Sequence, residues 1–293
     1  MYHRTSSVGM RIRLLVFQML VAALCGGLAV VPAISDIPEE IVEKFGNYHG
    51  IVIGINNYDA PDWRDLLYAE QDARDMKKIL TDSYGFEVTA IYGPEATRNK
   101  ILKTIRGKVT SLGANDNLLI FYGGHGQINP YTEEGFWIPV DAKNAVDEEN
   151  WISFSKVRNL VKAVNADVKR VALITDSCYG GALTERSGAL GGQLSPDDDA
   201  GMYQEWLIKH ATERGRLIIA SGGIEGVPDQ SEFTDALKAT LEENKLNMVD
   251  LHHVFSKILH DSYFQDQEQT PAIETLIGSR PGFPAQFVLI RRP

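Results

Sequence analysis

Apolar residues in this chain occur in two patterns that alternate along the sequence. Short uninterrupted runs predict strands that are buried on both faces, as in parallel sheets. Stripes with helical spacing predict amphipathic helices. The alternation therefore predicts an α/β fold with a mainly parallel sheet covered by helices on both faces. The predicted strands are 50–56, 86–92, 117–126, 171–175, 216–221, 272–277 and 286–290, and the predicted helices are 66–80, 97–112, 153–164, 231–241 and 250–263.

The segments between these elements lack either pattern. Residues 36–47 are polar and contain proline, so they are interpreted as a short connection. Residues 127–137 are typical of a hairpin or loop. Residues 180–201 are rich in glycine and acid, and a loop of this length inside a domain is usually functional or disordered. His252 and His253 lie off the apolar stripe of the last helix, so they are expected on its solvated face.

Two of the predicted strands end in reactive residues. One strand leads into Asp176, Cys178 and two glycines, and another ends in His125 between glycines. Ligands of open α/β sheets bind at the carboxyl ends of the strands, so the thiol and the imidazole are expected at one edge. A thiol nucleophile with an imidazole base is the core of a cysteine protease site.

The net charge of the chain indicates which classes of binding partner it suits. The 293 residues include 29 Lys and Arg and 39 Asp and Glu, a formal net charge of −10. Residues 1–35 carry three Arg and no acid, so the remainder has a net charge of −13. An acidic protein is a poor candidate for nucleic acid or anionic membrane surfaces, and it suits cationic substrates.

The first 35 residues form a segment of their own. Two arginines precede an uncharged apolar run, 14–31, and the small residues Ala33 and Ser35 follow. This order predicts a secretory signal and hence an exported protein, either secreted or periplasmic. The run is also long enough for an uncleaved membrane anchor, which is the alternative. Without residues 1–35, Cys178 is the single cysteine and has no partner for an internal disulfide.

With these features the sequence resembles the caspase–metacaspase family, and most closely its bacterial caspase-like branch. His125 lies about 50 residues before Cys178, which is the caspase spacing. The resemblance extends over about residues 48–290, and it implies a peptidase domain, 48–293, with a three-layer α/β/α sandwich around a mainly parallel six-stranded sheet. The matching stretches are Ile-Gly-Ile-Asn-Asn-Tyr58, Leu67-Tyr-Ala-Glu-Gln-Asp-Ala73, Tyr-Gly-Gly-His-Gly126, Thr-Asp-Ser-Cys-Tyr-Gly-Gly181, Ser-Glu-Phe-Thr234 and Gln-Thr-Pro271.

The resemblance also implies a reaction. His125 and Cys178 correspond to a dyad that cleaves peptide bonds, with the backbone amides of Gly126 and Cys178 as donors to the oxyanion. The sequence departs from most metacaspases at Tyr179, where His is usual, and at Glu70-Gln71, where Asn is common before the acid. Neither difference removes the dyad.

Two acidic residues suggest a substrate preference. Asp72 lies on the inward stripe of its predicted helix, where an acid is costly unless it serves a partner. In metacaspases, acids at the positions of Asp72 and Asp176 line the pocket for the residue before the cleaved bond. Two carboxylates there suit Arg, through paired hydrogen bonds, and also Lys. The alternative is that both acids have local structural roles. Ser221, at the end of the next strand, is a third substrate-binding candidate.

Caspases proper place basic residues in this pocket to accept Asp, and the sequence shows no basic pair placed to do so. The leading hypothesis is therefore a cysteine endopeptidase acting on peptides or proteins with Arg or Lys before the cleaved bond. One alternative is a catalytically silent scaffold with a caspase fold, which the intact His125 and Cys178 argue against. Another is a legumain- or gingipain-like protease of different specificity.

In this family the segment after the nucleophile is often cut. Arg186 is the only basic residue between Cys178 and Lys209, so it is the candidate for self-cleavage into portions of about 48–186 and 210–293, with Lys209 or Arg214 as alternatives. No cofactor or metal is expected. Calcium at the acidic stretches 141–149 and 197–199 is the alternative. Nucleic acid is not an expected partner, and a membrane is one only if residues 1–35 are retained.

Overall fold

The computed structural model describes residues 37–163, 168–184, 195–197, 199–222, 227–261, 270–277 and 286–292. The predicted signal or anchor segment, 1–35, and the predicted cleavage site, Arg186, lie outside these residues. Within the described part of the chain, no helix has both the length and the apolar character needed to cross a membrane.

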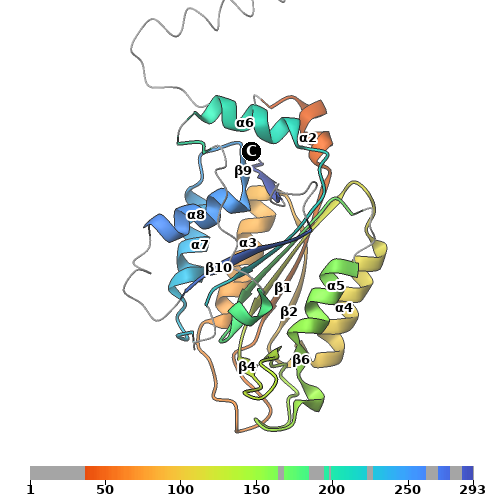
Figure 1. The fold of residues 1–293 in the computed structure, drawn as a ribbon, viewed down its shortest axis with the longest axis vertical. Helices are drawn as coiled ribbons and strands as arrows, with labels where there is room; N and C mark the ends of the chain where they lie inside the picture. Colours follow the sequence, from red (N-terminus) through yellow and green to blue (C-terminus); the bar gives the residue numbers. More distant parts are fainter. Residues whose placement is uncertain are drawn as a thin grey trace, which may run out of the picture. The chain divides into compact units, whose positions relative to one another are not determined.

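A six-stranded sheet with the order β10-β8-β7-β3-β1-β2 forms the centre of the fold (Figure 1). Its neighbours pair in parallel, except that β10 runs antiparallel to β8. The inner strands are buried on both faces, which explains their uninterrupted apolar runs. The strands of this sheet are β1 (Asn47–Gly54), β2 (Glu87–Tyr92), β3 (Asp116–Gly123), β7 (Arg170–Asp176), β8 (Gly215–Ala220) and β10 (Ala272–Ile277).

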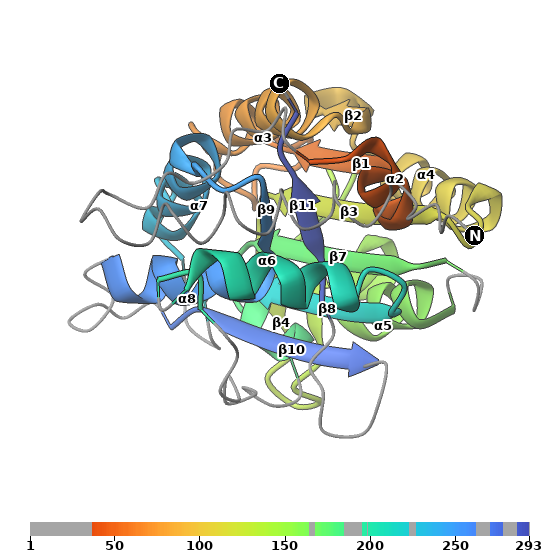
Figure 2. The ribbon, with the colours of Figure 1, turned by 90° about the horizontal axis from the view of Figure 1, so that it is seen from above.

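Helices cover both faces of this sheet (Figures 1 and 2). Helices α4 and α5 contribute apolar side chains to the core on one face. Helices α3, α6, α7 and α8 contribute to the core on the other face. The predicted three-layer α/β/α fold is therefore confirmed. The helices of the described residues are α2 (Glu39–Phe45), α3 (Ala69–Tyr84), α4 (Arg98–Ser111), α5 (Phe154–Ala163), α6 (Ala200–Lys209), α7 (Glu232–Glu243) and α8 (Leu251–Asp261).

Local capping signals fix where several helices begin and end. The Thr97 side chain accepts a hydrogen bond from Lys100 N, and the Ser231 side chain accepts one from Thr234 N, each at 3.3 Å. Gly85 ends α3 with a φ of 67°, a left-handed conformation that favours glycine. These local residue types thus define three helix ends.

Two segments without a clear pattern contain helices that the sequence analysis missed. Residues 36–47 are expected to be a connection, but they contain α2, a seven-residue helix in which Phe45 is buried and Ile41 and Val42 pack partly buried against the core. The acidic end of 180–201 contains the start of α6, whose first turn is capped by Asp199 accepting from Met202 N at 2.9 Å. The capping role of Asp199 depends on the helix that follows it, and that helix is not among those predicted from the sequence.

The smaller sheets complete the fold. The predicted hairpin at 127–137 is confirmed by the antiparallel pairing of β4 (Gly126–Ile128) with β5 (Gly135–Trp137), and β5 also pairs with β6 (Ile152–Ser153). The last predicted strand, β11 (Val288–Ile290), pairs with β9 (Met248–Asp250) outside the central sheet.

The expectation for the paired histidines of α8 was wrong for one of them. His252 is 4% exposed rather than solvated, and His253 lies half-buried with its ring 5.9 Å from that of Tyr203. Tyr203 belongs to α6, the helix that the sequence analysis missed, so that contact with α8 was not foreseen.

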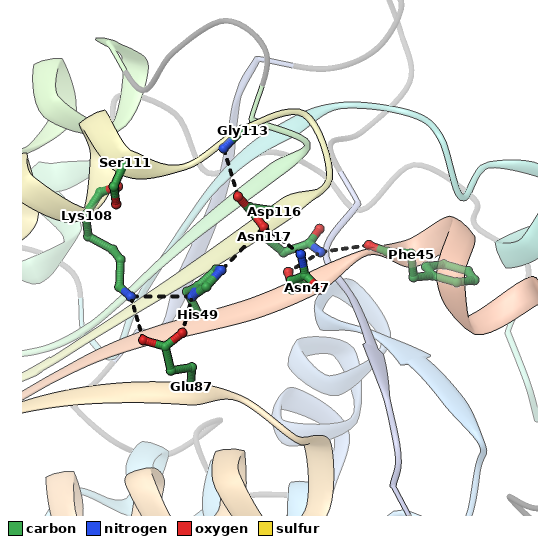
Figure 3. A network of polar contacts seen from close by, with 9 residues as sticks. All are labelled: Phe45, Asn47, His49, Glu87, Lys108, Ser111, Gly113, Asp116 and Asn117. Carbon is green, nitrogen blue, oxygen red and sulfur yellow. Dashed lines mark hydrogen bonds and ion pairs between the residues drawn. The ribbon is translucent and has the colours of Figure 1, made fainter. Parts of the chain in front are cut away.

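Polar residues gather where β1 and β3 begin (Figure 3). We call Asn47, His49, Glu87, Lys108 and Asp116 the amino-end cluster. The His49 ring lies between two carboxylates, with Nδ1 3.3 Å from Glu87 Oε2 and Nε2 3.4 Å from Asp116 Oδ1. Lys108 Nζ lies 3.2 Å from Glu87 Oε1. Asp116 also accepts hydrogen bonds from Asn47 Nδ2 at 3.0 Å and Gly113 N at 2.8 Å. The cluster thus ties β1, β2 and β3 to α4.

Candidate active site

The two reactive residues follow neighbouring strands of the sheet. His125 comes just after β3 and Cys178 just after β7, and these strands are parallel with Gly123 opposite Asp176. Gly124 N donates a hydrogen bond to Asp176 O at 3.3 Å, so the two segments remain paired just beyond the last residues of β3. The topology therefore brings His125 and Cys178 to one edge, as the sequence predicted.

Gly126 allows the two loops to approach closely. A Cβ atom at this position would lie 2.0 Å from Cys178 O, so any larger residue would push the loops apart. Directly after the nucleophile, Tyr179 adopts a φ of 60°, an unusual conformation for a residue with a large side chain. The chain thus turns sharply on leaving Cys178, into the short 3₁₀ helix Gly180–Leu183.

The His125 ring is held in a defined orientation and tautomer. Its Nε2 lies 2.7 Å from Arg64 O, and because a carbonyl only accepts, Nε2 carries the proton. Nδ1 is then the basic nitrogen. The His125 backbone is fixed as well, since its N–H donates to Tyr58 Oη at 2.8 Å and its carbonyl accepts from Tyr122 Oη at 2.9 Å.

The surroundings of His125 favour the neutral imidazole. Burial lowers the pKa of His125 below 6.5, and the positive charge of Arg64 acts in the same direction. The hydrogen bond to the Arg64 carbonyl and the charge of Asp229 oppose this shift without cancelling it. A neutral imidazole with a free Nδ1 is able to accept a proton at neutral pH.

Cys178 is partly exposed and is the free thiol of the described residues. Its Sγ lies 3.2 Å from the backbone nitrogen of Val227, which donates to it, and 3.7 Å from Val227 O. The segment that contains Val227 is fastened nearby, because the Asp229 carboxylate accepts hydrogen bonds from Leu67 N at 3.0 and 3.1 Å. This contact could not be predicted from the sequence, since Val227 is 49 residues from Cys178.

One cavity of about 120 Å³ joins the reactive residues to the two predicted acids. His125, Cys178, Asp72 and Asp176 all line it. Asp72 is 7% exposed and Asp176 is 9% exposed, so neither acid is a surface charge. The remaining lining residues are Arg64, Leu66, Ala69, Gly123, Gly124, Ser177, Val227, Pro228 and Asp229.

Both acids have side-chain donors, and the hydroxyls of Ser221 and Ser231 lower the pKa of Asp176 in addition to the donor described next. Thr234 Oγ1 donates to Asp176 Oδ2 at 2.6 Å, and Lys238 Nζ donates to Asp72 Oδ1 at 2.6 Å. Burial nevertheless raises the pKa of Asp176 and that of Asp72, and this effect outweighs the donors, which act in the opposite direction. Both carboxylates are therefore incompletely compensated in the cavity.

Ser221, the third substrate-binding candidate, is fully buried at the end of β8. Its backbone N–H extends the pairing with β7 by donating to Thr175 O at 2.9 Å. Its hydroxyl lies near enough to lower the pKa of Asp176, yet it forms no hydrogen bond of normal length among the described residues. Ser221 thus lies beside the cavity and not in its lining.

Two basic residues lie near these acids, although the sequence shows no basic pair placed to accept Asp. Arg64 lines the cavity, and Lys238 forms an ion pair with Asp72. Arg64 lies in the loop before α3, where its carbonyl serves His125. Lys238 is 166 residues from Asp72 in sequence, so only the packing of α7 against α3 reveals the pair.

The acidic stretches considered for calcium have structural partners where they are described. Asp141 accepts a hydrogen bond from Arg98 N at 2.8 Å, and Asp147 accepts one from Glu149 N at 3.0 Å. Asp199 caps α6. Among the described residues, no three His, Cys, Asp or Glu side chains are grouped to hold a metal ion.

Comparison with known protein families shows which family the chain belongs to. Residues 49–278 match the family described as the caspase domain. The chain belongs to this family. Caspase domains are cysteine peptidases, so the chain has the fold of a caspase-like protease. A comparison with curated proteins gave no match.

Solved structures with a similar fold come from bacteria and insects. The Geobacter sulfurreducens protein GSU0716 is 21% identical, covers 82% of this chain and 97% of its own, and has a TM-score of 0.59. Caspase-1 from Spodoptera frugiperda is 14% identical, with coverages of 79% and 87% and a TM-score of 0.51. The Drosophila initiator caspase Dronc is 13% identical, with coverages of 89% and 88% and a TM-score of 0.54. At these identities the similarity concerns the fold of the caspase domain alone.

Proposed function

We propose that this caspase domain is a cysteine endopeptidase with Cys178 as nucleophile and His125 as general base, and that it cleaves after Arg or Lys. The observation that carries the proposal is the single cavity lined by His125, Cys178, Asp72 and Asp176. It combines a thiol, an imidazole with a free basic nitrogen, and two buried carboxylates that lack full compensation.

The proposed reaction has two steps. Nδ1 of His125 takes the proton of the Cys178 thiol, and Sγ forms a bond to the substrate carbonyl carbon. The backbone N–H groups of Gly126 and Cys178 are the proposed donors to the oxyanion. His125 then gives its proton to the leaving amine as the C–N bond breaks, which leaves a thioester. In the second step His125 takes a proton from a water molecule, whose oxygen bonds to the thioester carbon. The C–S bond then breaks, His125 returns the proton to Sγ, and the carboxylic acid product is released.

The proposed preference for Arg or Lys follows from the charges in the cavity. Among the described residues that line it, Asp72, Asp176 and Asp229 are acidic and Arg64 is basic. Burial raises the pKa of both Asp72 and Asp176, which means that their charged forms lack sufficient counter-charge. A cationic substrate side chain supplies that charge, and a guanidinium can donate to both carboxylates at once.

The rival specificity is an acidic residue before the cleaved bond. It is favoured by one observation, the presence of Arg64 and Lys238 beside the acids. Among the described lining residues, however, Arg64 is one basic residue against three acids, and Lys238 is already paired with Asp72. An acidic side chain would therefore enter a cavity whose net charge repels it.

A panel of fluorogenic peptides that differ only before the cleaved bond tests the proposal. We expect turnover of Arg and Lys peptides, with Asp, Asn and Ala peptides cut at least about tenfold more slowly. Parallel reactions with a chelator and with added calcium separate a metal requirement from specificity. Purified Cys178→Ala is the control for contaminating proteases. Efficient cleavage of the Asp peptide would support the rival specificity, and turnover by Cys178→Ala would contradict the nucleophile.

A further inference from the structure

Lys238 lies at the meeting point of three carboxylates. Its Nζ is 2.6 Å from Asp72 Oδ1, 3.0 Å from Asp235 Oδ1 and 3.6 Å from Asp75 Oδ2. Asp235 belongs to α7, like Lys238, whereas Asp72 and Asp75 belong to α3. The ammonium therefore connects the two helices that pack side by side on this face of the sheet (Figure 1).

The three carboxylates differ in their access to solvent. The Asp72 side chain is 10% exposed, whereas Asp75 is 38% exposed and Asp235 is 49% exposed. Of the three, only Asp72 lines the cavity that contains His125 and Cys178. Water can solvate the two outer carboxylates, but Asp72 depends on Lys238 for its compensation.

Helix α7 holds one oxygen of each acid in the cavity. Thr234 and Lys238 are four residues apart, so they lie on the same face of α7. Thr234 binds Oδ2 of Asp176, and Lys238 binds Oδ1 of Asp72. Within the described residues, Lys238 is the side-chain donor to Asp72, whereas Asp176 also has the Ser221 and Ser231 hydroxyls nearby. Oδ2 of Asp72 thus stays available to a ligand.

We infer that Lys238 is a positioning residue for substrate recognition: it keeps Asp72 ionised inside the cavity and holds Oδ1, so that Oδ2 can accept from the cationic side chain before the cleaved bond. This inference rests on the proposed function, because it assigns a role in binding the Arg or Lys of that proposal. Lys238 itself does not line the cavity, so it acts through Asp72.

The electrostatic balance at Asp72 explains why the lysine is needed. Burial raises the pKa of Asp72, the charges of Asp235 and Asp75 act in the same direction, and only the bond and charge of Lys238 oppose them. Burial by itself lowers the pKa of Lys238, but the bonds to Asp72 and Asp235 outweigh this and raise it, so Lys238 stays charged. Without Lys238, nothing in this set opposes protonation of Asp72.

The other charged groups around the cavity set the background for this effect. Asp176 is close enough for its own pKa to be raised by the charge of Asp72. Arg64 and Asp229 line the same cavity. All three remain in a Lys238 variant, so dividing the variant's KM by the wild-type KM at each pH removes their contribution.

The activity test compares Lys238→Met with wild type on Arg and Ala peptides between about pH 5 and pH 8. At the acid end we expect the KM ratio for the Arg peptide to rise at least about tenfold, which is the loss of one charge-assisted hydrogen bond. At pH 8 the ratio should approach one or fall below it, because Asp72 is then ionised without its resident cation. The kcat ratio, and both ratios for the Ala peptide, should stay flat. Lys238→Arg should restore the wild-type profile.

Two controls separate positioning from structural support. Asp235→Asn removes the outer partner of the same ammonium, and because the Asp235 charge favours protonation of Asp72, its KM ratio should not rise at acid pH. If Lys238→Met does not fold, Lys238→Gln takes its place. A uniform loss of kcat/KM at all pH values and for both peptides would mean a structural ion pair only and would overturn the inference.

A second readout does not depend on catalysis. In the Cys178→Ala background, the carboxyl carbon of Asp72 is titrated by NMR with and without Lys238→Met. We expect the Asp72 pKa to rise when Lys238 is removed, and an unchanged pKa would overturn the inference even if the enzyme prefers Arg. Conversely, a wild-type enzyme that cuts Asp peptides and rejects Arg peptides would overturn both the proposed specificity and the role of Lys238. The two failures are therefore distinguishable.

Discussion

The acids at the two ends of the central sheet have pKa shifts of opposite sign. At the amino end, partial burial alone would raise the pKa of Asp116, but hydrogen bonds from Gly113 and Asn47 and the contact with His49 lower it below the ordinary value. At the carboxyl end, burial raises the pKa of Asp72 and Asp176 in spite of their donors.

This difference distinguishes a structural acid from an acid kept for a ligand. A carboxylate whose partners are all supplied by the protein stabilises the fold. A buried carboxylate with one oxygen unpaired costs stability, and it recovers that cost only when a cation binds. The same chemical group thus marks support at one end of the sheet and a candidate recognition site at the other.

Removing the nucleophile, at the carboxyl end of the sheet, should have the largest effect on activity. Cys178→Ala is expected to lower kcat/KM for the Arg peptide by at least about 10⁴-fold, because no other group replaces the thiolate. The fold should be retained, with a change in unfolding free energy below about 1 kcal/mol, because the thiol is partly exposed. Activity assays and chemical denaturation on the same preparation check both. A residual activity of a few per cent would contradict the proposed reaction.

Asp176→Asn should reduce activity and increase stability together. We expect kcat/KM for the Arg peptide to fall about 100-fold, because one charged partner of the guanidinium is lost. Because the pKa of Asp176 is raised, its charged form destabilises the folded state. This destabilisation is complete above the folded pKa and absent below the ordinary carboxyl pKa. The neutral variant should therefore be about 1 kcal/mol more stable at pH 7 and equal to wild type in acid. Denaturation at several pH values measures this difference.

The same substitution at the amino end should have the opposite sign. The pKa of Asp116 is lowered, so its charge stabilises the fold above the ordinary carboxyl value, and this contribution is lost as pH falls through the folded pKa. Asp116→Asn should cost about 1–2 kcal/mol at pH 7 and less in acid, with kcat/KM unchanged within about twofold. Equal signs for the two Asn variants would break the comparison between the ends of the sheet.

The sequence predicted those parts of the site that depend on one strand or one helix at a time. His125 and Cys178 follow uninterrupted apolar runs, and such runs end at the edge where parallel sheets bind ligands. Asp72 was noticed because an acid on an apolar stripe is conspicuous. The fold class followed from the same alternation of runs and stripes.

The parts that were missed depend on packing between distant segments. Lys238 is an ordinary lysine on an amphipathic helix until α7 is placed against α3. The Arg64 carbonyl and the Val227 amide are backbone groups, and their contacts with His125 and Cys178 leave no trace in residue type. Helix α6 was missed because its cap lies in an acidic run, and His252 because the burial of its side of α8 depends on tertiary packing. In each case the missing information was which segment packs against which.

The smallest predicted effect concerns the pH dependence of catalysis. The reaction needs neutral His125, whose pKa is lowered chiefly by burial. At saturating Arg peptide the cavity acids are already paired with substrate, so kcat should fall only below pH 6.5, the ordinary histidine value. Because the Asp229 charge raises the pKa of His125, Asp229→Asn should move this acid limb slightly further toward low pH.

A matched change at the other end of the sheet provides the control for this pH shift. Glu87→Gln removes a carboxylate that contacts a histidine of the amino-end cluster, His49, and Glu87 is not in the cavity lining. The acid limb of kcat should therefore stay at its wild-type position in Glu87→Gln. If the acid limb of the kcat profile shifted in Glu87→Gln but not in Asp229→Asn, the titrating group would not be His125. The assignment of His125 as general base would then fail.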